Sequence, residues 1–209
     1  TMLTIAVSGE ASALTAFDAA TGRELWVYQT DGPVRFAPAV AGNSVCFGSD
    51  DGYFYCVDLN TGQLRWRHKV VPSERRLLGN RRLISVWSIR GGPVVADGRV
   101  YFAAGVWPFE GTFLYALDLE KITSGDVPDS AAEVVTLTDM TPQGYLVASA
   151  GNVFIPCGRA LAGCYNIEKG ALQPLTYDSR GLTDYHVTAS DRWLFHGQRV
   201  IDLATRKML

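Results

Sequence analysis

One pattern of residues occurs twice in this chain, 40 positions apart. Residues 16–26 read A-F-D-A-A-T-G-R-E-L-W, and residues 56–66 read C-V-D-L-N-T-G-Q-L-R-W. The shared positions are Asp18, Thr21, Gly22 and Trp26 in the first copy and Asp58, Thr61, Gly62 and Trp66 in the second. A period of this length is typical of folds that stack one supersecondary unit on copies of itself. The chain is therefore expected to be a repeat protein.

Shorter copies of the pattern extend the repeat toward the C-terminus, where Asp118, Asn166 and Asp202 fill the Asp position. Each unit also contains short runs rich in Val, Phe, Tyr and Trp between turn residues, which predict β-strands. In the clearest unit the expected strands are 36–41, 44–49, 53–58 and 63–68. Because four-stranded sheets repeated about an axis form a β-propeller, we predict an all-β propeller of four-stranded antiparallel blades.

We expect residues 1–209 to form a single propeller domain. The predicted blades are residues 1–30, which lack a strand, then 31–69, 91–138, 142–177 and the nearly complete 183–209. An open arc leaves unpaired faces and strand edges at both ends, and natural proteins usually cover these. We therefore interpret the domain as an arc of a larger ring, completed by further blades. A five-bladed closure and the pairing of two copies into one ring are the alternatives.

The shared residues have a local physical role. The Asp carboxylate can accept hydrogen bonds from backbone N–H groups of the following turn, and Gly suits the left-handed position of that turn. Trp26 and Trp66 follow four residues after the Gly, on the expected outermost strand. A large flat ring there can pack against the neighbouring blade and donate its N–H to that blade's backbone. We interpret these residues, and Asp118, as structural.

Composition excludes several classes of partner. Nineteen Lys and Arg oppose 21 Asp and Glu, a formal net charge of −2, so no global basic field favours nucleic acid or an anionic membrane. The longest apolar runs fall far short of the roughly 20 residues of a membrane helix. We expect neither nucleic-acid binding nor membrane insertion. The start of the chain has no basic stretch followed by an apolar one, so no signal peptide is expected within it.

An insertion between two expected blades concentrates positive charge. From Arg65 to Arg90 eight Lys or Arg residues face the single acid Glu74. Long connections in compact domains are often functional, and guanidinium groups suit carboxylates and phosphates. The candidate ligand-binding residues are Arg75, Arg76, Arg81, Arg82 and Trp87, with Trp87 as a stacking platform. The alternatives are arginines paired with acidic blade loops and a Trp packed in the core.

Other chemistry-bearing residues give weaker signals. Trp107 and Phe109 lie in an insertion that could anchor a partner or fold back over the blade. Residues 120–133 are polar and predict a mobile loop. The sequence Asp184-Tyr185-His186 lacks an associated nucleophile, and no spacing of Cys and His indicates a metal site. We expect no catalytic residues and no bound metal.

The four cysteines leave the redox state open. A three-residue turn at residues 50–52 would place Cys46 directly opposite Cys56, at a Cα separation of about 5.5 Å. That separation permits a disulfide, but free buried cysteines are also common and directly opposed pairs strain the bridge. Both a disulfide and two free thiols are therefore possible. Cys157 and Cys164 flank the equivalent hairpin of a later blade.

The two A-F-D-A-A-T-G-R-E-L-W-type segments, each followed by P-x-V and V-x-F strands, resemble the pyrroloquinoline-quinone-type β-propeller repeat. The resemblance is strong over residues 14–69 and 91–119. That family includes quinoprotein alcohol dehydrogenases and the noncatalytic lipoprotein of the outer-membrane assembly machine. It implies a propeller, commonly eight-bladed, in a periplasmic or extracellular setting. The shared fold does not by itself imply that this chain shares the binding site of those enzymes.

The dehydrogenases of that family are recognised by an adjacent Cys-Cys pair, a Trp floor, a calcium site and an Asp base. This chain has no adjacent cysteines and no evident calcium trio. We therefore expect a noncatalytic scaffold or binding module that presents loops to a protein or small ligand, with no cofactor. The alternative is part of a quinone-dependent dehydrogenase, with pyrroloquinoline quinone and calcium bound at a site completed by blades outside this chain.

Overall fold

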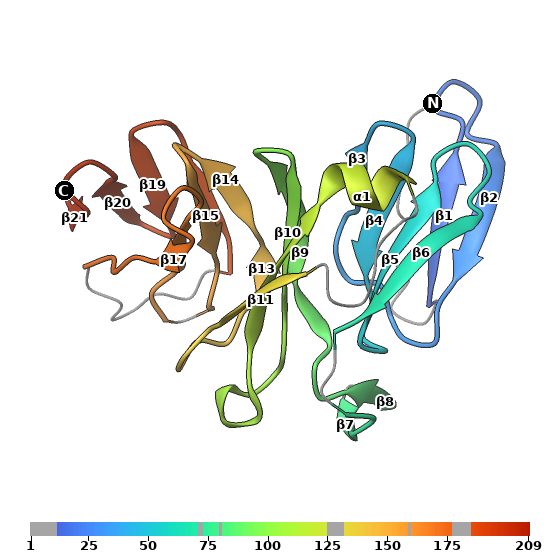
Figure 1. Ribbon diagram of the computed structural model, residues 1–209, viewed down its shortest axis with the longest axis horizontal. Coiled ribbons are helices and arrows are strands. Elements are labelled where there is room, and N and C mark those ends of the chain that lie inside the picture. The colour runs from blue at the N-terminus through green and yellow to red at the C-terminus, as the bar shows by residue number, and fades with distance from the viewer. Residues whose placement is uncertain (1–11, 71–72, 80, 125–131, 159, 177–184) are drawn as a thin grey trace.

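The structure is a computed structural model that describes residues 12–70, 73–79, 81–124, 132–158, 160–176 and 185–209. Within these residues the chain forms six antiparallel or mainly antiparallel sheets and almost no helix, and four of them contain four or more strands. The larger sheets follow one another along an open arc (Figure 1). The predicted all-β propeller fold is confirmed. No described helix is long and apolar enough to cross a membrane.

The first sheet contains β1 (Ala13–Phe17) and β2 (Glu24–Gln29). The second contains β3 (Ala39–Ala41), β4 (Ser44–Gly48), β5 (Tyr53–Asp58) and β6 (Leu64–Lys69). A separate hairpin contains β7 (Arg76–Gly79) and β8 (Arg82–Ser85). The next sheet contains β9 (Ile89–Ala96), β10 (Arg99–Ala104), β11 (Phe113–Asp118) and β12 (Glu133–Thr136), and β13 (Gly144–Tyr145) joins it in parallel to β9. The last two sheets contain β14 (Val147–Ser149), β15 (Asn152–Ile155), β16 (Gly163–Asn166) and β17 (Ala171–Leu172), then β18 (Val187–Ala189), β19 (Trp193–His196), β20 (Arg199–Asp202) and β21 (Lys207–Met208).

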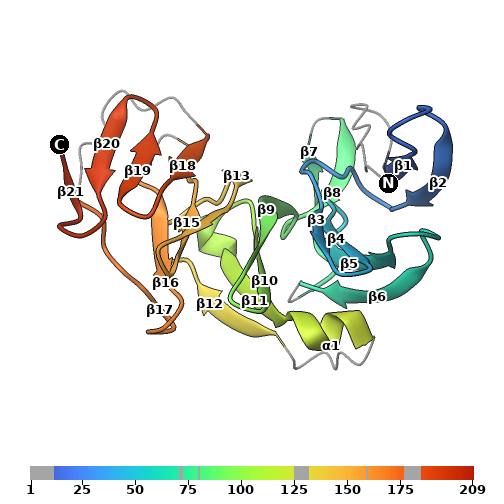
Figure 2. The same cartoon turned by 90° about the horizontal axis from the view of Figure 1, so that it is seen from above.

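Each large sheet runs from an inner to an outer edge of the arc. Seen from above, β3, β9 and β18 lie toward the inner side of the arc, and β6, β12 and β21 lie toward its outer side (Figure 2). Apart from β13, which pairs with β9, consecutive strands within each sheet are hydrogen-bonded neighbours, as expected for blades built from successive hairpins. The expected strands of residues 36–68 correspond to β3–β6, with boundaries within three residues.

The Asp-x-x-Thr-Gly turns form as the sequence predicts. Asp18 Oδ1 accepts hydrogen bonds from the backbone N–H of Thr21 at 2.9 Å and from its hydroxyl at 2.8 Å. Asp58 Oδ1 accepts the same pair from Thr61 at 3.0 and 3.2 Å. The Gly that closes each turn, Gly22 or Gly62, has a φ of 69°, a conformation that disfavours residues with a Cβ.

The segment after Asp118, the third copy of the repeated Asp, does not form the predicted turn. Asp118 Oδ1 accepts the backbone N–H groups of Glu120 and Lys121, but the chain continues as a short helix, α1 (Leu119–Ser124). The loop expected over residues 120–133 is therefore wrong for its first part, because Asp118 caps a helix there. Within that segment, residues 125–131 lie outside the described residues, and Glu133 at its end already belongs to β12.

The core consists of apolar layers between consecutive sheets. Trp26 of β2 is buried against the second sheet and donates from Nε1 to Leu59 O at 3.0 Å, as expected for a Trp between blades. The next layer contains Phe54 and Phe102, whose rings stack with centroids 3.8 Å apart. Trp66 is only half-buried at the edge of that layer. Its sheet faces α1 instead of a second Asp-x-x-Thr-Gly turn, and its neighbour Arg65 donates to Thr123 O.

The hairpin register that the turn at residues 50–52 predicts is confirmed, since Cys46 pairs directly with Cys56 across β4 and β5. Both are free thiols in the core, as are Cys157 and Cys164. Cys164 pairs with Phe154, so it does not lie opposite Cys157.

Candidate functional site

The basic insertion folds as the β7–β8 hairpin, which projects beyond the ends of the blade strands (Figure 1). Its alternating pattern buries Ile84, while Leu78 and Leu83 form a cross-strand pair on the outer side. These two leucines are 75% and 63% exposed. Exposed apolar residues that face each other across a hairpin are unusual on a monomeric surface and indicate a contact site.

The four candidate arginines divide into two pairs. Arg75 forms a bidentate ion pair with Glu110, with nitrogen–oxygen distances of 2.5 and 2.8 Å. Arg82 has a long contact to Ser12 Oγ at 3.5 Å, so it faces the first sheet. Arg76 and Arg81 are exposed beside the leucine pair. The first pair fixes the hairpin to its neighbours, and the second pair is available to a ligand.

Trp87 is not placed as a stacking platform. It follows the hairpin, is 4% exposed, and donates from Nε1 to Glu110 O at 3.1 Å. The ring therefore packs in the core, as the alternative interpretation states. Through Glu110, Trp87 and Arg75 fix the connection between β10 and β11 to the base of the hairpin.

That connection contains η1 (Pro108–Glu110) and carries two exposed aromatic residues on the same side of the molecule as the hairpin (Figure 1). Trp107 and Phe109 stack on each other with ring centroids 5.6 Å apart, and Phe109 is 79% exposed. The aromatics therefore do not fold back over the blade. We define the hairpin face as the outer residues of the hairpin and these aromatics: Arg76, Leu78, Arg81, Leu83, Trp107 and Phe109.

A second cluster, which sequence reasoning missed, lies at the base of the hairpin. Arg35 Nε donates to Asp50 Oδ2 at 2.6 Å, and Arg90 Nη2 lies 3.8 Å from the same oxygen. Asp50 is fully buried, and its backbone O accepts a hydrogen bond from Ser85 N–H at 2.7 Å. The residues 50–52 satisfied a hairpin-turn pattern, so nothing in the sequence marked Asp50 as an ion-pair centre.

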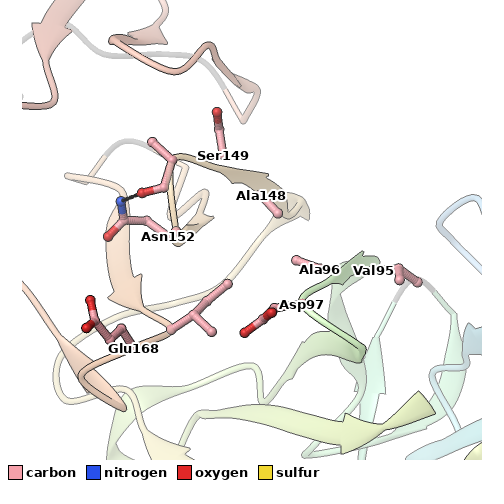
Figure 3. A pocket seen from close by; sticks show the side chains of 10 residues that line it. Val95, Ala96, Asp97, Ala148, Ser149, Asn152 and Glu168 are labelled. Carbon is pink, nitrogen blue, oxygen red and sulfur yellow. Dashed lines mark hydrogen bonds between the residues drawn. The ribbon is translucent and has the colours of Figure 1, made fainter. Parts of the chain in front are cut away.

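The opposite side of the arc carries a hollow of about 530 Å³ between two sheets (Figure 3). It is lined by strand ends and turns with mostly small side chains: Val95–Asp97, Ala148–Asn152, Ile167 and Glu168. Figure 3 shows Asp97 and Glu168 as the acidic side chains at its wall, and Asn152 donates to Ala150 O. The lining includes the Ser149 hydroxyl, and it contains no His, Cys or Lys side chain that could activate that hydroxyl.

The described residues contain no group of three His, Cys, Asp or Glu side chains able to hold a metal ion. In the sequence Asp184-Tyr185-His186, Asp184 lies outside the described residues.

The repeated turns, the Trp packed between sheets and the arc of four-stranded sheets define a quinoprotein-like β-propeller domain. A sequence model of the family described as the outer membrane protein assembly factor BamB matches residues 2–171, and this chain belongs to that family.

Relatives of two kinds share this fold. The dehydrogenase subunit of the quinone alcohol dehydrogenase of Gluconacetobacter polyoxogenes is 33% identical over 121 residues, covering 52% of this chain and 16% of that subunit. The crystal structure of BamB from Moraxella catarrhalis has a TM-score of 0.57 and 19% identity, covering 92% of this chain and 53% of that chain. The quinohemoprotein alcohol dehydrogenase ADHIIG of Pseudomonas putida HK5 has a TM-score of 0.64 and 17% identity, covering 94% and 38%. This chain thus spans only part of each relative.

Proposed function

We propose that this chain is a noncatalytic binding module that docks an acidic protein partner on its hairpin face. The observation that carries the proposal is the outer side of the β7–β8 hairpin, where exposed Leu78 and Leu83 lie beside Arg76 and Arg81. Arginine and aromatic side chains are enriched among the residues that dominate protein interfaces, and contiguous exposed apolar patches mark contact sites.

The charges of the hairpin favour an acidic partner. Glu74 is already paired with Lys69, and Glu110 with Arg75. Among the described residues, no ion pair of Arg76 or Arg81 is formed. Their positive charges therefore remain available to carboxylates of a partner, and Leu78 and Leu83 would pack against its apolar side chains.

The stacked pair Trp107 and Phe109 would widen this surface. Arg75 and Trp87 both contact Glu110, so the β10–β11 connection and the hairpin are fixed to one another before a partner binds. Such preorganisation reduces the entropy lost on binding. Membership of the assembly-factor family supports a role in protein binding and a periplasmic setting, and further blades of the same chain, or a second copy, would complete the ring.

The second candidate function is part of a quinone-dependent dehydrogenase. The observation in its favour is the 33% identity to a quinone alcohol dehydrogenase subunit. Under this function, blades outside this chain would complete the site for pyrroloquinoline quinone and calcium. Titration with pyrroloquinoline quinone and calcium, followed by quinone absorbance, separates the two functions: saturable binding favours the dehydrogenase.

The docking proposal is tested with labelled poly-L-glutamate as the acidic probe, titrated into the chain and followed by fluorescence anisotropy. The double variant Arg76→Ala, Arg81→Ala should bind roughly tenfold more weakly, from two exposed charge contacts of about 0.2–1 kcal/mol each. Its melting temperature should stay nearly unchanged. Affinity should fall with added salt, because exposed charges are screened.

The matched control is Arg23→Ala, Lys207→Ala, which removes two exposed basic side chains from other parts of the chain. This control should leave binding within about twofold, since its charges lie away from the hairpin. An equal loss in both double variants would show that only net charge matters. Binding to phosphatidylserine vesicles but not to poly-L-glutamate would also overturn the proposal, as would melting of the hairpin variant several degrees lower.

A further inference from the structure

A glutamate takes the position at which the first two repeats carry a tryptophan. Trp26 and Trp66 each pair with the residue two positions before the repeated Asp of their own sheet. In the β9–β13 sheet that residue is Ala116, two positions before Asp118, and it pairs with Glu133 of β12. The outer strand of this sheet therefore has a carboxylate where an indole is expected from the repeat.

The side chain of Glu133 joins its sheet to the following one, β14–β17, through polar contacts. Its Oε1 accepts a hydrogen bond from the Tyr165 hydroxyl of β16 at 3.1 Å. Its Oε2 pairs with Arg99 of β10. Between the first two sheets the same place is filled by the ring of Trp26, which belongs to the apolar layer there. A carboxylate fills less space than an indole, so this joint is packed less fully.

The turn that such a ring would cover is left open. Gly62 closes the turn against which Trp26 packs, and a Cβ added at Gly62 would lie 2.6 Å from the indole. Gly170 closes the equivalent turn between β16 and β17, with a φ of 60°. For a Cβ added at Gly170, the nearest atom outside its chain neighbours is Glu133 Oε1, at 3.8 Å. This turn can therefore accept a flat group that the chain itself does not supply.

The hollow of about 530 Å³ reaches this turn (Figure 3). Ile167 and Glu168 of the turn line it, and Ile167 is the counterpart of Leu59, whose carbonyl oxygen accepts the Trp26 N–H. The volume lies within the range of about 300–1,000 Å³ that is typical of small-molecule sites. The apolar part of the wall comes from Val95, Ala96, Ala148 and Ile167.

The rest of the wall is acidic. Asp97 and Glu168 are exposed, and neither carboxylate forms an ion pair within the part of the chain that the structure describes. The described residues that line the hollow include no Lys or Arg. Arg99, two residues after Asp97, is already paired with Glu133. A cation in the hollow would therefore meet two carboxylates that no basic residue of the lining neutralises.

We propose that this hollow binds an indole that carries an ammonium group, of which tryptamine is the simplest example. The ring would lie against the apolar wall, and its N–H would donate to Ile167 O as Trp26 donates to Leu59 O. A carbonyl oxygen has two lone pairs, so Ile167 O can accept this bond beside its contact from Gly170 N–H at 3.4 Å. The ammonium group would bind the carboxylates of the wall. This site lies on the side of the arc opposite to the hairpin face, and it does not depend on the proposed docking function.

The test is a protein-observed NMR titration of the chain with tryptamine and, in parallel, with indole-3-acetate, which has the same ring and a negative charge. Tryptamine should shift the amide resonances of Asp97 and Gly151 saturably. Indole-3-acetate should bind at least about tenfold more weakly, because attraction to the carboxylates becomes repulsion. The double variant Asp97→Asn, Glu168→Gln should bind tryptamine about fivefold more weakly. Asn suits the φ of 46° at position 97, so this variant should fold.

A second variant tests the place of the ring. Glu133→Trp restores the residue type of Trp26 and should lay an indole over Gly170. If the ligand ring occupies that place, the variant should bind tryptamine at least about fivefold more weakly. The tenfold preference for tryptamine over indole-3-acetate on the unmodified chain does not depend on this variant.

The matched control is Asp191→Asn, Glu24→Gln, which removes two exposed acids of the last and first sheets. It should leave tryptamine affinity within about twofold, and so should the Arg76→Ala, Arg81→Ala variant of the hairpin face. Equal affinity for the two ligands would overturn the proposal, as would no saturable binding of tryptamine. So would an equal loss in the two acid variants, or unchanged affinity in a folded Glu133→Trp variant. If Glu133→Trp does not fold, the two ligands and the acid variants decide the matter.

Discussion

Trp26 packs in the layer between the first two sheets, and replacing it by Ala would remove that contact. Trp26 is 8% exposed, and its ring lies against Gly62, where an added Cβ would be 2.6 Å from the ring. A buried Trp removes roughly 200 Å² from water, or about 5 kcal/mol at about 25 cal/mol per Å². Buried Trp-to-Ala changes cost about 3–5 kcal/mol, so we expect a loss of this size in the free energy of unfolding. Urea denaturation followed by circular dichroism measures it.

Two further variants separate the contribution of Trp26 packing from that of its hydrogen bond. Trp26→Phe keeps much of the packing but loses the hydrogen bond to Leu59 O, so it should cost about 1–2 kcal/mol. Trp107→Ala is the exposed control and should cost well under 1 kcal/mol. A loss below about 1 kcal/mol for Trp26→Ala would refute the assignment of this residue to the layer between blades.

The remaining predictions concern the turns and the thiols. Gly62→Ala should destabilise the chain more than Gly22→Ala, because both glycines have a φ of 69° but only Gly62 has a ring within reach of the added Cβ; equal losses in chemical denaturation would contradict this. Hydrogen bonds from Arg65 lower the pKa of Asp58 to about 2. The ionised Asp58 carboxylate should therefore contribute fully to the free energy of unfolding above the unfolded pKa of about 3.9. This contribution should be lost as the pH falls toward about 2. As the pH falls over that range, the melting temperature of the unmodified chain should decrease more than that of Asp58→Asn. Melting temperatures that decrease in parallel for the two proteins would argue against this prediction. Mass mapping of the nonreduced protein should find Cys46 and Cys56 as free thiols, whereas a bridged peptide would contradict the structure.

The repeated sequence pattern predicted most of the fold. Asp18 and Asp58 predict their turns because a short polar side chain, a following Thr and a Gly determine the local hydrogen bonds. The same marker at Asp118 did not predict α1, because an Asp that caps a turn can also cap a helix, and the Gly that would end the turn is absent.

The candidate site was less predictable, because it depends on contacts between distant segments. The basic composition of residues 65–90 marked the insertion that folds as the β7–β8 hairpin, but not which arginines pair within the fold. Arg75 pairs with Glu110 across 35 positions, and Trp87 donates a hydrogen bond to the backbone oxygen of the same residue. The cluster at Asp50 joins three segments that share no sequence pattern, so only the fold brings Arg35 and Arg90 to one carboxylate.

The central claim, that the hairpin face is where an acidic partner docks, is tested most directly by amide hydrogen exchange of the chain with and without poly-L-glutamate. Bound probe should slow exchange in residues 76–79, 81–85 and 105–111, and leave the hollow between Asp97 and Asn152 on the opposite side unchanged. Protection confined to that hollow or to the outer blade strands, with the hairpin exchanging as fast as in the free chain, would contradict the claim.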